Sequence, residues 1–333
     1  MRWLGLFLAV LLPIVIGGPR SKQHTPNYAE QVVVRSEAVQ LDSSDAGRTR
    51  VGSLTLIGGW KLSGVSPQFG GWSALHVDGD RFTAIGDAGT VLRFRLTRFG
   101  RAVEASIDPL PASCGQTDEN RTRDSESLTG DGRNWWVGYE SQTRLCRLDH
   151  AFRRGEAVYR PPLMAHWRKV GGPESVLRLA DGRFLVFAED PPRGEDMRPL
   201  LVFAGDPTDP RTPVTKLTYR PPEGFDPTDA AQLPDGRVLV LNRRFTLWNL
   251  FTSAITIIDP AQFAQGKVAE GPVIARFDRP LISDNFEGLA VTQEGDRTIV
   301  WMISDDNQMS WEATYLLKFA LDAGAGKGAR KPD

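Results

Sequence analysis

Short apolar runs separated by glycine-containing turns follow one another along most of the chain. From Ser73 onward, one pattern recurs about every 50 residues. Each copy starts with a polar residue, called the anchor here, and runs through a short apolar stretch into a turn that contains Gly and Asp. A strongly apolar run follows the turn and ends in a charged residue. The five copies are Ser73–Asp87, Glu126–Glu140, Glu174–Glu189, Asp229–Arg243 and Glu287–Asp305.

The local chemistry of each copy predicts a β-hairpin. Asp and Gly supply the positive φ angles that a tight hairpin turn requires. The run after the turn is rich in β-branched and aromatic residues, as at 184–187 and 238–241, which is typical of a strand buried on both faces. A third strand is expected after it in most copies, at 91–96, 144–148, 200–205, 254–259 and 315–321. No amphipathic run of helical length separates the strands, so the pattern does not support an α/β fold.

A repeat of about 50 residues built from strands and turns is typical of a β-propeller. Each unit can bury both of its faces only by packing between two neighbours, so we predict one closed all-β domain over residues 47–322. The stretch 52–64 before the five units also has a strand-like pattern. It either completes the last blade with strands from both chain ends or contributes to a sixth. The sequence therefore predicts a β-propeller of five or six blades.

Residues 1–18 have the pattern of an export signal. A single positive charge, Arg2, precedes an apolar run from Trp3 to Ile16, which is shorter than the roughly 20 residues that cross a bilayer. We expect residues 1–18 to be a signal peptide or an uncleaved N-terminal anchor, 19–46 a polar tether, and 323–333 a disordered C-terminal tail. The protein is therefore expected to be periplasmic or secreted, or held at the inner membrane through its N-terminal segment alone.

Overall charge and composition narrow the function classes. The chain has 40 Lys and Arg residues against 41 Asp and Glu residues, a balance that argues against a nucleic-acid binder because such binding depends on an excess of basic residues. Two cysteines, Cys114 and Cys146, either pair in an oxidising compartment or remain free thiols. With four histidines in the chain, they do not indicate the usual Cys/His zinc site. No Gly-x-Ser-x-Gly motif supports a serine hydrolase.

The anchors and the charged residues that end the second strands should lie at the same end of the propeller, because a hairpin brings the start of one strand next to the end of the other. The anchors are Glu126, Glu174 and Glu287, with Ser73 and Asp229 in the remaining copies. The strand-end residues are Asp87, Glu140, Glu189, Arg243 and Asp305. Carboxylates gathered at one opening repel one another, so a compensating charge is expected. Ca²⁺ or another divalent cation with oxygen ligands could supply it, and so could Arg243 and Arg244.

Five segments carry a resemblance to a known family. They are Gly71–Leu75, Asp124–Arg133, Gly172–Asp190, Asn242–Phe245 and Asn285–Val291. Through them, over about residues 52–321, the chain resembles the bacterial phytase-like family, whose members are described as having the esterase-like activity of phytase. The resemblance implies an exported β-propeller with acidic residues at a hydrolase site. It matches the family's repeated acids to Glu126, Glu174, Glu189 and Glu287, whereas Ser73 and Asp229 depart from the pattern.

We therefore predict a hydrolase of phosphate or related esters that is a monomer, takes a small anionic substrate and uses Ca²⁺ or another divalent cation. The predicted catalytic residues are Glu126, Glu174, Glu189 and Glu287. The predicted substrate-binding residues are Trp72, Asn242, Arg243 and Arg244. The predicted metal ligands are Asp87, Glu140 and Asp305. Trp248 is a further candidate for the edge of the pocket.

Three other interpretations are compatible with the same residues. Acids at strand ends also cap turns or pair with an arginine of the next blade, and such networks perturb acids without catalysis. A non-catalytic propeller could hold a ligand or an envelope protein at the same rim. A sugar-lactonase-like propeller would likewise use a central divalent metal with acidic and amide ligands.

Overall fold

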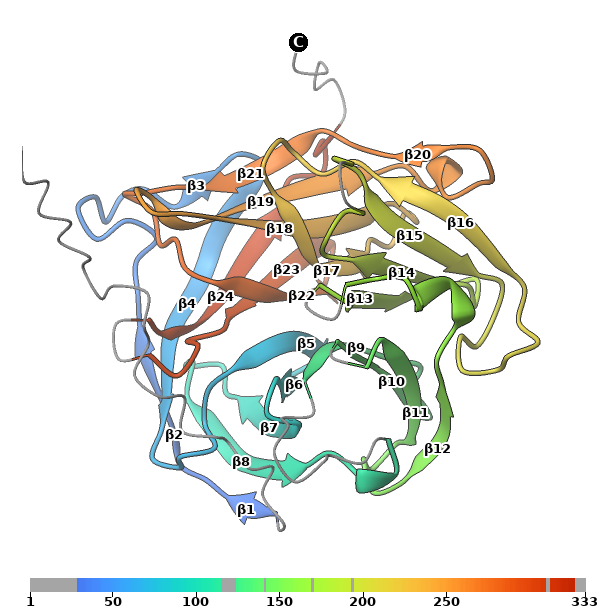
Figure 1. Ribbon diagram of the computed structural model, residues 1–333. Coiled ribbons are helices and arrows are strands. Elements are labelled where there is room, and N and C mark those ends of the chain that lie inside the picture. Colours follow the sequence, from blue (N-terminus) through green and yellow to red (C-terminus); the bar gives the residue numbers. More distant parts are fainter. Residues whose placement is uncertain are drawn as a thin grey trace, which may run out of the picture.

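The computed structural model describes residues 29–114, 124–140, 142–168, 171–192, 195–309 and 312–326. Within these ranges the chain forms strands and three short 3-10 helices, which are η1 (Ala112–Cys114), η2 (Pro162–Met164) and η3 (Pro260–Gln262). The strands form five sheets arranged as the blades of a propeller, as Figure 1 shows. The predicted all-β propeller is thus confirmed, and the number of blades is five.

The first four blades follow one another along the chain, and each begins with its innermost strand. The first holds β5 (Trp72–Asp78), β6 (Arg81–Gly86), β7 (Thr90–Leu96) and β8 (Ala102–Pro109), with β1 (Glu30–Gln31) outside them. The second holds β9 (Ser125–Gly130), β10 (Asn134–Tyr139), β11 (Arg144–Asp149) and β12 (Gly155–Tyr159). The third holds β13 (Pro173–Arg178), β14 (Phe184–Ala188), β15 (Arg198–Phe203) and β16 (Val214–Tyr219), with β20 (Val268–Ala269) at its edge. The fourth holds β17 (Asp226–Gln232), β18 (Val238–Thr246), β19 (Leu250–Ile258) and β21 (Val273–Phe277).

The fifth blade joins strands from both ends of the described chain. It holds β22 (Phe286–Glu294), β23 (Arg297–Ser304), β24 (Thr314–Leu321), β4 (Leu54–Gly64) and β2 (Val34–Ala38), with β3 (Arg50–Val51) paired to β4. β24 runs antiparallel to β4, from Thr314 opposite Leu62 to Leu321 opposite Leu54. This ladder closes the ring, so the structure adopts the first of the two arrangements that the sequence left open. β1 and β2 lie within the stretch predicted as a tether.

Packing between neighbouring blades holds the inner strands around the axis. The inner strands β5, β9, β13, β17 and β22 surround the axis, and each contacts the inner strands of both neighbouring blades (Figure 1). Aromatic rings fill the space between the sheets. Phe277 of the fourth blade, for example, contacts Phe286 and Phe319 of the fifth. Because each sheet buries apolar surface on both faces, the ring holds the inner strands in a constant orientation.

A disulfide bond joins Cys114 to Cys146, whose Cα atoms are 5.5 Å apart. The structure thus has the paired state of the two that the sequence left open, and the bond ties η1 to β11. The predicted signal peptide at 1–18 and the end of the predicted tail at 327–333 lie outside the described residues. None of the helices in the described ranges has the length and apolar character needed to span a bilayer.

Candidate active site

The inner strands are bulged at the same place in all five blades. In the second blade, Ser125 lies opposite Tyr139 and Ser127 lies opposite Gly138, so Glu126 has no residue opposite it. The residues bulged in this way are Ser73, Glu126, Glu174, Thr228 and Glu287. A β-bulge bends the strand and redirects one side chain, and bulges are common beside active sites. The recurring anchor of the sequence is therefore the bulged residue in four of the five blades.

The fourth blade differs from the others, because its bulged residue is not the anchor of the repeat. There the bulged residue is Thr228, because Pro227 lies opposite Asn242 and Asp229 lies opposite Leu241. Asp229 is buried instead, and its carboxylate accepts hydrogen bonds from Ala230 N at 2.8 Å and from Leu289 N at 2.7 Å. Burial raises the pKa of Asp229 well above its usual value, although these N–H groups oppose the shift. Asp229 therefore links the fourth blade to the fifth and is not equivalent to the glutamate anchors.

A second ring of residues lies beside the bulges. The second strand of each hairpin carries a residue opposite the one that precedes the bulge. These opposing residues are Gly86, Tyr139, Ala188, Asn242 and Ser304. The residues that follow them in the chain are Asp87, Glu140, Glu189, Arg243 and Asp305. Bulge residues and strand-end residues thus meet at one end of the propeller.

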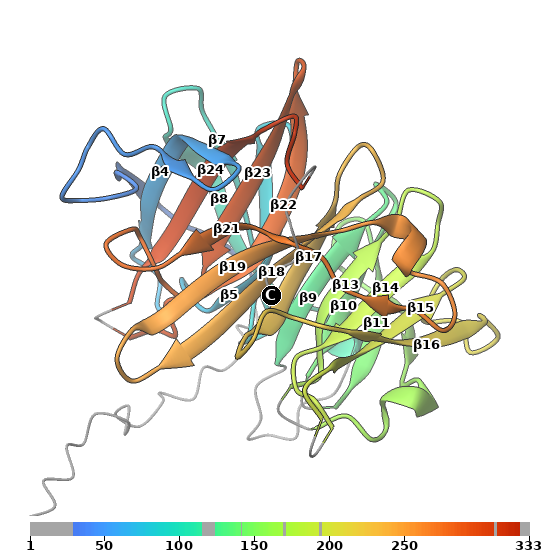
Figure 2. The ribbon, with the colours of Figure 1, turned by 90° about the horizontal axis from the view of Figure 1, so that it is seen from above.

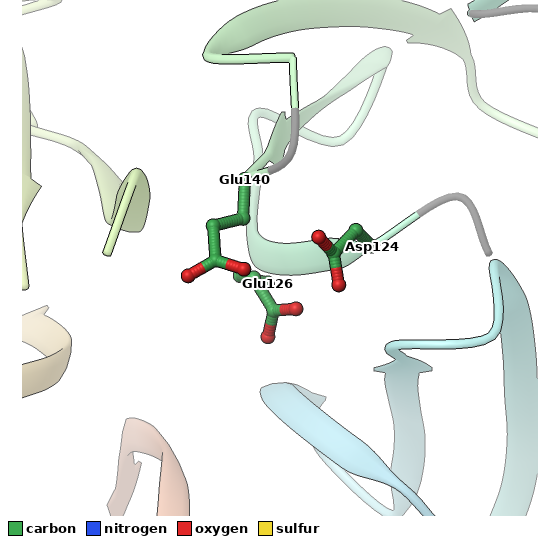
Figure 3. A group of neighbouring side chains, drawn as sticks. All are labelled: Asp124, Glu126 and Glu140. Carbon is green, nitrogen blue, oxygen red and sulfur yellow. The ribbon is translucent and has the colours of Figure 1, made fainter. Parts of the chain in front are cut away.

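Two overlapping groups of carboxylates form where these rings meet. Oxygen atoms of Asp124, Glu126 and Glu140 lie within 4.8 Å of one another, and so do oxygen atoms of Glu140, Glu174 and Glu189. Figure 3 shows the first group, in which the three carboxylates point toward a common space. Glu140 belongs to both groups. The second group joins acids of the second and third blades, so residues far apart in the sequence share one site.

Arg243 connects the third and fifth blades at this site. Its guanidinium donates hydrogen bonds to Glu189 Oε1 at 2.6 Å, to Asn285 Oδ1 at 2.6 Å and to Glu287 Oε1. The side-chain amide of Asn285 also donates to Glu287 Oε1, at 3.0 Å. Burial lowers the pKa of Arg243, but the negative charges of Glu287 and Glu189 outweigh burial and raise it overall. Arg243 is therefore a permanent positive charge among the acids.

Three acids of the site have strongly raised pKa values. Burial is the main cause for Glu126, Glu174 and Asp305, whose pKa values all lie well above the ordinary range. The negative charges of other acids in the site are the next cause of the raised pKa values. Asp87 is one of these acids, and its charge raises the pKa values of both Glu126 and Asp305. Acids from the first, second and fifth blades thus influence one another's protonation.

Glu140 and Glu287 both have pKa values of about 7. For Glu140, burial raises the pKa, the backbone N–H of Gly171 opposes that shift, and Asp124 adds to it. For Glu287, burial raises the pKa and Arg243 partly offsets the effect. Each of these side chains therefore changes its charge close to neutral pH.

Glu174 has an uncompensated oxygen atom. The residue is 9% exposed, and its Oε1 atom has no hydrogen-bond partner among the described residues. A buried carboxylate without a donor is costly, because nothing replaces the water that it loses on folding. An oxygen in that position is suited to a metal ion, and Glu140 and Glu189 provide neighbouring oxygens.

Three predicted substrate-binding residues have partners other than the acids among the described residues. Trp72 is fully buried in the core and packs edge-on against Phe69, so it has no surface to offer a substrate. Asn242 is buried within the fourth blade, where Tyr219 donates to its side-chain oxygen and its amide bonds backbone carbonyls. Arg244 lies over the ring of Phe225, 4.8 Å from the centroid. Within the described part of the chain, Arg243 is the predicted substrate-binding residue that bonds the acids.

Two residues of the site were not predicted, Asp124 and Asn285. Each stands two positions before a glutamate anchor, in the sequences Asp-Ser-Glu and Asn-Phe-Glu. A polar residue at that spacing is the signal that could have identified them. Among the predicted metal ligands, Glu140 belongs to both carboxylate groups. The charge of Asp87 acts on Glu126 and Glu287, and the charges of Glu287 and Asp87 act on Asp305.

The sequence model of a known family matches this region of the chain. The family is described as "Phytase-like: Esterase-like activity of phytase", and the match covers residues 67–308, which include the bulge residues and the strand-end residues. The chain belongs to the phytase-like family. The resemblance seen in the sequence is thereby confirmed. No curated protein sequence is similar enough to count as a match.

Several solved structures are similar to this phytase-like protein. Glutaminyl cyclase of Myxococcus xanthus is 13% identical, with 80% of this chain and 97% of that chain covered and a TM-score of 0.46. The Cps50 (Swd1) β-propeller domain of Myceliophteria thermophila is 10% identical, with 88% and 99% covered and a TM-score of 0.42. The major allergen Mala s 1 of Malassezia sympodialis is 11% identical, with 91% and 99% covered and a TM-score of 0.44.

Proposed function

We propose that this protein hydrolyses phosphate esters or related esters where the bulge residues and the strand-end residues meet. The observation that carries the proposal is the grouping of Glu140, Glu174 and Glu189 within 4.8 Å beside the guanidinium of Arg243. Membership of the phytase-like family supports the same class of reaction. Ester hydrolysis develops negative charge, and an arginine with a cation-binding group of acids is suited to stabilise that charge.

The residues of the site fit a divalent cation. Among the described residues, no hydrogen-bond donor competes for the buried Oε1 atom of Glu174. Carboxylate oxygens are the ligands that Ca²⁺ and similar hard cations prefer. Glu140, Glu174 and Glu189 would hold the ion, and Glu140 also belongs to the group with Asp124 and Glu126. When bound, the cation would polarise the ester and lower the pKa of a water molecule.

The chain's own side chains supply the remaining chemistry. Glu287, with a pKa of about 7, is suited to take up or release a proton near neutral pH. Arg243 and Asn285 fix the orientation of its carboxylate through their hydrogen bonds. Arg243 lies between Glu189 and Glu287, and its N–H groups can stabilise an anionic group of the substrate there.

We also propose that the protein is a bacterial monomer that works outside the cytoplasm, either in the periplasm or after secretion. The pattern of residues 1–18, with Arg2 before a short apolar run, supports export. The disulfide between Cys114 and Cys146 supports it as well, because disulfides persist in oxidising compartments.

Hydrolysis assays with p-nitrophenyl phosphate, p-nitrophenyl acetate and a sugar lactone test the proposal, each with added Ca²⁺ or with EDTA. We expect turnover of the phosphate ester that EDTA abolishes. Glu174→Gln and Glu287→Gln should lower kcat by about 100-fold or more while circular dichroism shows a folded protein. Glu37→Gln, on the exposed part of β2, is the matched control and should keep full activity.

Other outcomes would contradict the proposal. Faster turnover of the lactone would support a sugar-lactonase-like enzyme. Saturable binding without turnover of any substrate would support a non-catalytic propeller. Unfolding of both glutamine variants would mean that the carboxylates serve the structure.

A further inference from the structure

The hairpin of β18 and β19 reaches farther beyond the site than its counterpart in the second blade. There, β10 ends at Tyr139, one residue before Glu140. In the fourth blade, β18 continues past Arg243 to Thr246, which pairs with Leu250 of β19. The added pairs lengthen the hairpin by about 10 Å. In Figure 2 this hairpin ends in the light orange loop at the lower left.

The extension carries three exposed apolar side chains, Phe245, Leu247 and Trp248, called the apolar tip here. Their exposed fractions are 52%, 72% and 92%. Single exposed apolar residues are ordinary on protein surfaces, but a large aromatic group beside two further apolar side chains indicates a contact surface. We therefore expect the apolar tip to bind a partner that has an apolar group.

A continuous series of contacts links Phe245 of the apolar tip to the acids. The rings of Phe245 and Phe251 have centroids 5.1 Å apart. The guanidinium carbon of Arg243 lies 5.9 Å from the centroid of Phe251, and the same guanidinium donates to Glu189. Ser283 holds this part of β19 by donating its hydroxyl to the backbone oxygen of Phe251 at 2.8 Å. One hairpin thus presents a positive charge at the acids and an apolar surface outside them.

The charges of the site limit how many anionic groups a substrate can bring. Arg243 bonds acids of the third and fifth blades, and the surrounding carboxylates outnumber it. One cation together with Arg243 can compensate one phosphate group. A substrate with several phosphates would add negative charge to a site in which neighbouring carboxylates already raise the pKa values of Glu126 and Asp305, so each further phosphate would weaken binding.

We infer that the substrate is an ester with one anionic group, which meets Arg243, and one apolar group, which packs on the apolar tip. This inference rests on the proposed function and names the substrate class of the same site. Contact with exposed aromatic and aliphatic side chains removes apolar surface from water. We expect that contribution to strengthen binding about tenfold, since the tip covers one side of the apolar group.

Titration of non-hydrolysable phosphonates by isothermal calorimetry tests the inference. Naphthylmethylphosphonate, methylphosphonate and inositol hexakisphosphate are compared in the presence of Ca²⁺. The wild type should bind the naphthyl compound about tenfold more tightly than methylphosphonate, and more tightly than inositol hexakisphosphate. A variant with Leu247→Ser and Trp248→Ser should lose this preference while it keeps its affinity for methylphosphonate. Phe99→Ser is the matched control, because Phe99 is 76% exposed in the loop that follows β7, away from the acids, and the preference should persist.

Several results would overturn the inference. These are equal affinities of the wild type for the two phosphonates, failure to bind either one, a preference that survives in the tip variant, and tighter binding of inositol hexakisphosphate. Vesicle binding that depends on the tip, with the phosphonate preference unchanged in the variant, would assign the tip to a membrane surface instead. Failure of the proposed function appears separately as absence of turnover, because the phosphonate titration needs no hydrolysis.

Discussion

Replacing Glu287 with glutamine should reduce the dependence of stability on pH. Burial raises the pKa of Glu287 from 4.5 to about 7, although Arg243 opposes the shift. The side chain is 14% exposed, so solvent screens the effect little. A carboxyl group whose pKa is higher in the folded protein contributes stability that is fully present below the unfolded pKa. That contribution is lost as the pH rises through the folded pKa.

The two pKa values set the size of the effect. With a pKa of about 7 in the folded protein and 4.5 in the unfolded chain, Glu287 should stabilise the fold by roughly 2.5 kcal/mol more at pH 5 than at pH 8. Glu140, whose pKa is also about 7, acts in the same direction. Glu126 and Glu174 have raised pKa values as well. The cation-free protein should therefore be less stable at pH 8 than at pH 5.

Urea titrations at pH 5 and pH 8, with EDTA present, measure this difference in the free energy of unfolding. We expect Glu287→Gln to reduce the difference by about 2.5 kcal/mol. Glu37→Gln, the same change at an exposed position of β2, should leave it unchanged. A wild-type free energy of unfolding that does not fall between pH 5 and pH 8 would refute the reasoning, because the site would then not raise the pKa values of its acids.

Three further changes have defined outcomes. Asp229→Ala should lower the free energy of unfolding by about 2–4 kcal/mol, because it leaves the N–H groups of Ala230 and Leu289 unpaired. A urea titration measures this loss, and a curve that matches the wild type would exclude this link between blades. Cys146→Ser should lower the free energy of unfolding by up to about 4 kcal/mol, since the disulfide joins residues 32 positions apart and restricts the unfolded chain. Denaturation of the wild type with and without a reductant is the check. No loss of stability in the variant or in the reduced wild type would contradict the prediction. Ca²⁺ at about 100 times its Kd should stabilise the wild type by about 2.7 kcal/mol, which raises Tm by about 4 °C at an unfolding entropy of about 0.6 kcal/mol per kelvin. Glu174→Gln should lose most of that rise in Tm, and an equal rise in both proteins would show that Glu174 is not a ligand.

The sequence contains enough information for the architecture and for much of the site. Apolar runs and Gly-containing turns repeat with the hairpins, so the blades could be predicted before the structure was known. The same repeat places Glu140 and Glu189 beside the anchors, because hairpin pairing follows directly from the turn. Closure by β4 and β24 could be proposed but not chosen, because pairing between chain ends depends on the geometry of the whole ring.

The remaining features depend on register and packing, which the repeat does not encode. Thr228 and Asp229 are neighbours of similar polarity, and the one-residue shift that makes Thr228 the bulged residue leaves no mark in the pattern. Trp72 stands beside an anchor, yet packing against Phe69 buries it completely. Asp124 lies before the repeated unit begins, so an alignment of the units does not include it.

A crystal structure of the protein grown with Ca²⁺, with the anomalous signal of calcium recorded, tests the central claim most directly. The claim is that acids of separate blades bind one divalent cation. The account predicts a peak coordinated by Glu140, Glu174 and Glu189, with oxygen distances of about 2.3–2.6 Å. Calcium peaks confined to other surfaces, with Glu174 Oε1 still lacking a partner, would contradict it.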